Sequence, residues 1–190
     1  MTLKLITPPG TEPVSLAEAK LQLRAGDDED TLITALIVTA REAAQHELGR
    51  ALITQDWERV LDAFPAAELQ LGMPPVQSIL QVQYVDAAGA LQTLAPAAYT
   101  LDAENAQDAF ALPALGYSWP ATLDTANAVR VRFRCGYGEA AAVPAAVKAW
   151  MLLRIGTLYR YREDFQQGSL AQLPDHFTDR LLDPFRVWGA

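Results

Sequence analysis

The sequence predicts an α+β chain in which a bundle of three to four helices, drawn from both ends of the chain, carries an inserted antiparallel β domain. Two segments before residue 50, and a third that starts near residue 143, have apolar residues at helical spacing. Between them the pattern changes to short alternating runs, separated by turns rich in Pro, Gly and Ala. Two helices cannot bury their apolar stripes alone, so we expect the third to pack back on them. The predicted domains are residues 1–50 with 141–190, which form the bundle and a C-terminal tail, and residues 51–140, which form the β insertion.

The first predicted helix covers Leu16–Arg24. Ser15 precedes it, and Glu18 follows at the spacing of a capping box, in which a hydroxyl and a carboxylate satisfy free amide groups of the first turn. Gly26 is expected to close this helix, and the chain before it is expected to be extended.

The second and third helices also have recognisable limits. The acidic run Asp27–Asp30 is expected to open the second, because negative charge is stabilising at a helix N-terminus, and Gly49 is expected to cap its end. The third is predicted to begin at Val143–Pro144, since proline is tolerated in the first turn, and to run to about Glu163. A short helical segment is expected around Asp175–Leu182.

The middle of the chain is predicted to form strands. The runs expected to be extended are Ile53–Asp62, Leu69–Leu71, Ser78–Asp86, Leu91–Leu94 and Val129–Tyr137. Asp86–Gly89 has the composition of a hairpin turn, because its glycine can adopt positive φ.

The clearest alternation is in the last of these strands. Its apolar side chains share one face, and Arg130, Arg132 and Arg134 share the other, as a half-buried strand requires. The favoured interpretation is a solvated or ion-paired sheet face at which a partner protein makes contact. Contact with DNA or RNA is the alternative.

The charge balance argues against a protein that grips phosphates. With 23 acidic and 15 basic side chains the net charge is −8, whereas affinity for nucleic acid depends on clustered Lys and Arg. No apolar run approaches the ~20 residues needed to span a bilayer, and the N-terminus lacks the apolar core of a signal peptide. We therefore expect a soluble intracellular chain without a membrane partner.

No enzyme class, metal site or cofactor site is predicted. His46 and His176 are the histidines, and neither has a second ligand at metal-binding spacing, so His46 is interpreted as a surface residue near a helix end. Cys135 falls on the apolar face of its strand, where a thiol is protonated and inert. The motifs of nucleophilic catalysis and of phosphate-cradling loops are missing from the sequence.

The C-terminal tail is unusually apolar. Two interpretations stay open: it packs back on its own domain, or it docks on a neighbouring subunit or partner, where aromatic and Arg anchors dominate the binding energy. The candidate contact residues of the tail are Phe177, Leu181, Leu182, Phe185, Arg186 and Trp188.

Several stretches, in conserved order along nearly the whole chain, carry a resemblance to a known family. They are Pro13–Lys20 with Leu23–Arg24 and Asp27–Asp30, Ile33–Gly49 followed by Arg50–Gln55, Pro74–Ile79 with Tyr84–Asp86, Gly136–Gly138 through Val143–Pro144 to Leu158–Glu163, and Leu181–Arg186. The sequence resembles the head–tail connector (head-completion) proteins of long-tailed double-stranded DNA phages and prophages. Its β segment is larger than that of the plainer, all-helical members.

The resemblance implies a structural adaptor without catalytic residues or cofactors. Such a protein forms a ring of about a dozen subunits beneath the portal protein, where it serves as the platform for tail or head-closure proteins. DNA would pass through the ring without sequence-specific binding. The implied location is the head–tail junction of the virion, after synthesis in the bacterial host cytoplasm. A small regulatory or ligand-binding module, using the β insertion, is the alternative function.

Overall fold

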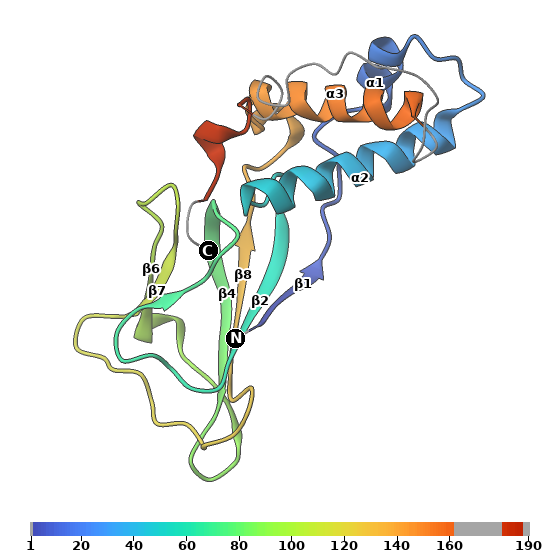
Figure 1. The fold of residues 1–190 in the computed structure, drawn as a ribbon. Coiled ribbons are helices and arrows are strands. Elements are labelled where there is room, and N and C mark those ends of the chain that lie inside the picture. Colours follow the sequence, from blue (N-terminus) through green and yellow to red (C-terminus); the bar gives the residue numbers. More distant parts are fainter. Residues whose placement is uncertain (1, 162–179, 188–190) are drawn as a thin grey trace. The chain divides into compact units, whose positions relative to one another are not determined.

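The computed structural model describes residues 2–161 and 180–187 of the chain. In these residues it contains three α-helices and two antiparallel β-sheets, so the predicted α+β class is confirmed (Figure 1). The chain divides into two compact units. A β unit comprises Met1–Gly10, Gly49–Tyr137 and Val187–Ala190, and a helical unit comprises Thr11–Leu48 and Gly138–Arg186.

The helices of the helical unit, α1 (Leu16–Leu23), α2 (Asp30–Leu48) and α3 (Ala145–Arg160), pack against one another. The contact faces of α2 and α3 are apolar because apolar residues recur in both at helical spacing, whereas α1 contributes one buried residue. These buried residues are Ala19 of α1, Ile33, Ile37, Ala40, Ala44 and Leu48 of α2, and Val147, Trp150, Met151 and Ile155 of α3.

The ends of these helices explain their lengths. The predicted capping box is present: the Ser15 hydroxyl accepts a hydrogen bond from the Glu18 amide at 3.2 Å, and the Glu18 carboxylate accepts from the Ser15 amide at 2.7 Å. The predicted stop at Gly26 is wrong. The helix ends earlier because Arg24 adopts the left-handed conformation, with φ of 54°, and the amide of Ala25 returns to the carbonyl of Lys20.

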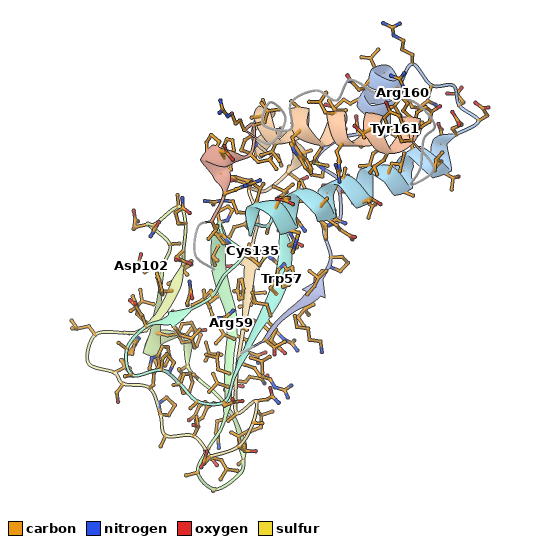
Figure 2. All side chains as sticks on the ribbon, viewed as in Figure 1. Trp57, Arg59, Asp102, Cys135, Arg160 and Tyr161 are labelled. Carbon is orange, nitrogen blue, oxygen red and sulfur yellow. The ribbon has the colours of Figure 1, made fainter. Side chains whose placement is uncertain are left out.

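Polar contacts also join the elements of the helical unit. Arg41 of α2 is buried and donates to Glu12 at 2.9 Å. The Tyr159 hydroxyl of α3 donates to Glu29, just before α2. At the end of α3, the guanidinium of Arg160 lies over the ring of Tyr161, 5.7 Å from its centroid (Figure 2).

The first sheet of the β unit has the strand order β1-β2-β8-β4-β5 in the described chain. Its strands are β1 (Thr2–Thr7), β2 (Gln55–Leu61), β8 (Val129–Cys135), β4 (Val76–Val85) and β5 (Leu91–Thr93). A second sheet has the order β3-β7-β6, formed by β3 (Leu69–Gln70), β7 (Phe110–Pro113) and β6 (Tyr99–Asp102). Short 3₁₀ turns lie at Pro96–Ala98, Ala140–Ala142 and Asp183–Phe185.

Five strands occur where alternation predicted them, within a few residues of the expected limits. Three were not predicted. Thr2–Thr7 was expected to be merely extended, but it pairs antiparallel with β2 at the edge of the first sheet. Strands β6 and β7 are short and include Pro113, and each is stabilised by pairing with a neighbour rather than by its own alternation.

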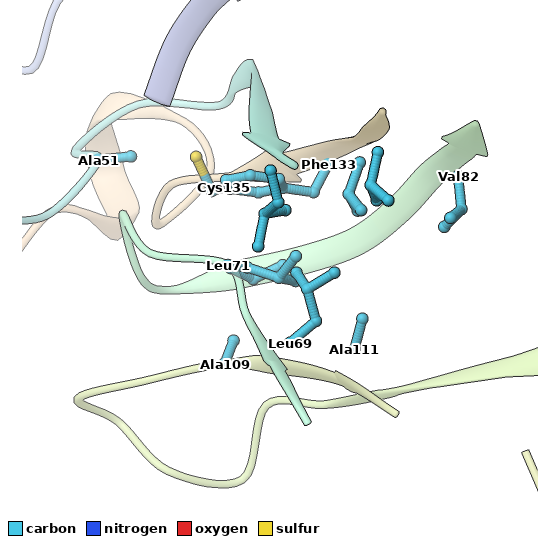
Figure 3. Packing of buried hydrophobic residues seen from close by; sticks show 12 residues of the cluster. Ala51, Leu69, Leu71, Val82, Ala109, Ala111, Phe133 and Cys135 are labelled. Atoms are coloured by element: carbon cyan, nitrogen blue, oxygen red, sulfur yellow. The ribbon is translucent and has the colours of Figure 1, made fainter. Parts of the chain in front are cut away.

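The core of the β unit lies on one face of the first sheet (Figure 3). Phe133 and Val131 of β8 contribute fully buried side chains to it, as do Val82 of β4, Leu69 of β3 and Ala111 of β7. The second sheet therefore covers the apolar face of the first and leaves the arginine face of β8 uncovered by this core.

One glycine is required where the chain leaves β8. Gly136 has φ of +114°, and a Cβ added there would lie 2.3 Å from the carbonyl oxygen of Ile53. Its amide donates to Pro75 at 2.8 Å, and its carbonyl accepts from the Gln77 side chain at 2.8 Å. Only a residue without a side chain permits this close crossing of segments.

Two predicted features fall wholly or partly outside the described residues. Helix α3 ends at Arg160, with Tyr161 as its C-cap, so it stops slightly before the expected end at about Glu163, a residue outside the described part of the chain. The expected helical segment at Asp175–Leu182 is described only from residue 180 onward.

Candidate functional site

The three arginines of β8 lie on the exposed face of the first sheet, and the intervening residues of this strand are buried. The register of β2 against β8 places Asp56 opposite Arg134 and Glu58 opposite Arg132. Residues directly opposite in an antiparallel pair point to the same face, so Arg132 and Arg134 each meet a carboxylate. This arrangement supports the ion-paired interpretation of the stripe over a nucleic-acid contact.

Arg134 and Asp56 form a bidentate ion pair. The Arg134 Nε and Nη2 groups donate to the two carboxylate oxygens of Asp56 at 2.7 and 3.0 Å. These bonds lower the pKa of Asp56 and raise that of Arg134. Planar, bidentate pairing of this kind is a property of Arg that Lys lacks.

Arg132 is held by a more buried partner. Its Nε donates to Glu58 at 2.8 Å, and the Glu58 residue is only 4% exposed. Arg130 has Val60 and Gln83 as its register neighbours, and in the described part of the chain it is the member of the stripe without a carboxylate opposite. Two of the three arginines of the stripe are thus paired with carboxylates within the sheet.

The same face contains an open hollow of about 380 Å³. Asp56, Gln81 and Arg132 are among the polar residues that line it. Its apolar lining comes from the edges of the sheet and the chain after β5: Ile6, Leu80, Leu94, Pro96 and Tyr99. The hollow therefore combines apolar walls with polar groups, of which Asp56 and Arg132 are already held in ion pairs.

The opposite face of β2 carries two apolar residues, Trp57 and Leu61, and two polar ones, Gln55 and Arg59. Trp57 pairs with Phe133 and Arg59 with Val131, so both point toward the buried core side, and Figure 2 shows them on β2. Burial lowers the pKa of Arg59. Arg59 thus belongs to the structural face rather than to the exposed stripe.

The described tail residues lie against the helical unit. Leu182 is completely buried. Arg186 pairs with Glu47 of α2 at 3.3 Å, and Leu181 and Phe185 are partly exposed. Phe177 and Trp188 lie outside the described residues.

Cys135 and His46, the side chains considered for chemistry, lie where the sequence predicted them. Cys135 is fully buried, and burial raises the pKa of its thiol, while His46 is exposed on α2. Among the described residues, acidic, histidine and cysteine side chains do not gather in a group of three or more that could hold a metal ion. The helices of the same residues include none long and apolar enough to cross a membrane.

No protein-family model matches this chain, and the search of curated proteins gave no match either. Solved structures do match it over its whole length. A chain from the neck of an empty gene transfer agent (GTA) particle, computed with C6 symmetry, has a TM-score of 0.81 and 24% sequence identity. Chains from the virion of a native GTA particle and from a native GTA neck computed with C12 symmetry give TM-scores of 0.80 and 0.76, with 24% and 22% identity. Each match covers 100% of this chain and 97% of the other.

The likeness establishes the fold. Because the match is end to end, the large β unit belongs to the fold shared with these chains and is not an addition to it.

Sequence reasoning missed two parts of this site. It found the arginines but not their partners Asp56 and Glu58, although the alternation of acidic residues along Gln55–Arg59 was a usable signal. It also missed the hollow, whose walls come from segments far apart in the sequence.

Proposed function

We propose that this chain is a non-enzymatic structural protein of the neck of a phage-like particle, where it connects the head to the tail. The observation that carries the proposal is the end-to-end likeness, at a TM-score of 0.81, to a chain of a GTA neck. A match covering nearly all of both chains is stronger support than a shared subdomain, since each surface of the fold has a counterpart.

The proposed working form is a ring of about a dozen subunits beneath the portal protein, with tail or head-closure proteins bound below. The cyclic symmetries of the matching necks, C6 and C12, support a ring. We further propose the division of labour expected from the sequence, with a helical framework carrying an inserted β domain.

The charge distribution fits a passive relation to DNA. The chain has a net charge of −8, and two of the three arginines exposed on the first sheet are paired with carboxylates. A surface of this kind has little affinity for phosphates, which suits a channel through which DNA moves.

The tail is proposed as a docking element for the portal protein. Leu181, Phe185, Arg186 and, beyond the described residues, Phe177 and Trp188 are the residues assigned to this role. Their partner would be an apolar surface with acceptors for a guanidinium.

The test is deletion of the coding sequence in a strain that produces the particles. We expect filled heads and free tails that do not join, seen by electron microscopy, and recovery when the wild-type chain is supplied. Normal, complete particles in the deletion strain would contradict the proposed function.

Complementation with a chain truncated after Asp183 tests the tail separately. We expect it to restore far fewer joined particles than the wild type does. The matched control is a full-length chain with Arg24→Gln, a change at an exposed position of the same unit outside the tail. If the truncated chain restores joining as well as this control, the tail does not dock.

A further inference from the structure

The loop between β7 and β8 presents apolar side chains to solvent. Leu115 is completely exposed and Tyr117 is 56% exposed. No charged residue occurs from Ala109 to Leu123. This uncharged loop places an exposed leucine beside an exposed tyrosine, and tyrosine is a residue type enriched among the anchors of protein interfaces.

This loop is held in a defined shape. The Tyr117 amide donates to the Ala114 carbonyl at 2.9 Å, and Gly116 has φ of +83°, which makes a tight turn with Leu115 at its corner. The Ala114 amide donates to Ala98 at 3.0 Å and so fixes the base of the turn.

Aromatic contacts hold the chain just after the turn. The Trp119 ring stacks on that of Phe64, with centroids 4.7 Å apart, and its indole N–H donates to Ala67 at 2.7 Å. Phe64 in turn meets the edge of Tyr84 of β4 at 5.8 Å. A turn fixed in this way can bind without a large cost of ordering.

The hollow on the arginine face has the chemistry that such a turn requires. Its walls, which include Leu80 and Leu94, suit a leucine side chain, and its polar lining offers partners for a tyrosine hydroxyl. Its volume of about 380 Å³ is in the range that holds small ligands or a few side chains.

The electrostatics also match. The Asp56 and Arg132 groups in the hollow are already neutralised, by Arg134 and Glu58 respectively. An uncharged loop that covers them leaves no charge without a partner, whereas a charged loop would.

We propose that the Leu115–Tyr117 turn of one copy of this chain inserts into the hollow of the next copy. The inference rests on the proposed function, because it assigns the contact between neighbours in the ring. The turn and the hollow are formed by different residues of the same β unit, so the contact can repeat head-to-tail from copy to copy. Repeated head-to-tail contacts close into a ring when the rotation between copies permits it.

The direct test is disulfide cross-linking of a variant that carries Tyr117→Cys on the turn and Thr93→Cys in the hollow. Thr93 lines the hollow and is exposed, and the native Cys135 is buried and cannot compete. Oxidation should give a ladder of oligomers larger than dimers on non-reducing gels, since each copy then has both halves of the bond. Each single variant can give at most dimers.

The matched control is the double variant Tyr117→Cys with Thr100→Cys. Thr100 is exposed on β6 and does not line the hollow, so this variant should give no ladder. Equal ladders from the two double variants would overturn the inference, because they would report random collisions.

A second measurement uses Leu115→Asp, which places a charge on the turn. We expect self-association, measured by analytical ultracentrifugation, to weaken by about tenfold or more. The control Leu21→Asp changes a leucine that is 83% exposed on α1 and should leave it unchanged. Circular dichroism confirms that both variants fold. Equal self-association of Leu115→Asp and the wild type would overturn the inference.

Both measurements are made on the purified chain at high concentration and on assembled particles. Rings in the particle without the specific ladder would overturn this contact and leave the proposed function intact. The specific ladder from a chain that is not incorporated into particles would support the contact and contradict the proposed function.

Discussion

Arg134 of β8 donates to both carboxylate oxygens of Asp56 of β2, at 2.7 and 3.0 Å, across the ladder that joins the two strands. The two residues are 78 positions apart in the sequence, so the pair forms only when the strands are in register. An intact pair therefore requires that β2 and β8 are in the correct register, and it also neutralises charge on the exposed face of the sheet.

We predict that Asp56→Asn lowers stability at neutral pH. Because the Arg134 hydrogen bonds lower the pKa of Asp56 from its ordinary value of 3.8, the pair stabilises the fold above that value, and its contribution is lost as the pH falls through the lower, folded pKa. The difference between wild type and variant in urea denaturation should be largest near neutral pH and should vanish in strong acid. Asp124→Asn, at an exposed loop position, is the control and should show no such trend. A difference that is constant with pH would contradict the assignment.

Gly136→Ala is expected to destabilise the β unit by about 3 kcal/mol or more, since the added Cβ both strains the backbone and meets the Ile53 carbonyl at 2.3 Å. Gly89→Ala is the matched control, because Gly89 also has positive φ, +85°, but has open space around it. The control substitution should lower the free energy of unfolding by about 1 kcal/mol. Chemical denaturation measures both, and equal losses would show that the close crossing at Gly136 is unimportant.

Phe133→Ala should cost about 3–5 kcal/mol, because Phe133 is completely buried between the two sheets and its removal leaves a cavity. Leu115→Ala, at a fully exposed position, should change stability by less than about 0.5 kcal/mol. Denaturant midpoints provide the comparison. A loss below about 1 kcal/mol for Phe133→Ala would mean that the sheets do not enclose it.

Ser15→Ala removes the hydroxyl that accepts from the Glu18 amide at 3.2 Å. We expect a loss of about 1 kcal/mol, typical of a helix N-cap. The pKa of Glu18 should return only partly toward its ordinary value, because the Ser15 backbone amide, the largest cause of its lowering, remains in the variant and only the hydrogen bond from the hydroxyl is lost. Thermal denaturation measures the first effect and NMR titration the second. Thr31→Ala, exposed on α2, should reproduce neither.

The helices were predictable because their signals are local. Ser15 with Glu18, and the acidic start of α2, act within one turn of the residues they stabilise, and both features are present in the structure. The alternation of Val129–Cys135 was equally local and correctly separated buried from exposed residues.

The remaining strands, the ion pairs and the hollow depend on partners that are distant in the sequence. Strand β1 is a strand because β2 is beside it, about 50 residues later, and β6 and β7 depend on each other. The carboxylate partners of the arginines are 74 and 78 residues away. The hollow and the exposed turn are properties of the assembled β unit, and no short stretch of sequence reveals them.

The position of β8 in the first sheet affects how the chain is made. This central strand lies between β2 and β4, yet it is the last of the five to leave the ribosome. Until it emerges, β2 and β4 have edges without their final partner, and folding must wait for contacts that are distant in sequence. We therefore expect the β1–β2 and β4–β5 pairs to be able to form first, and the complete sheet to form only after β8 has been synthesised.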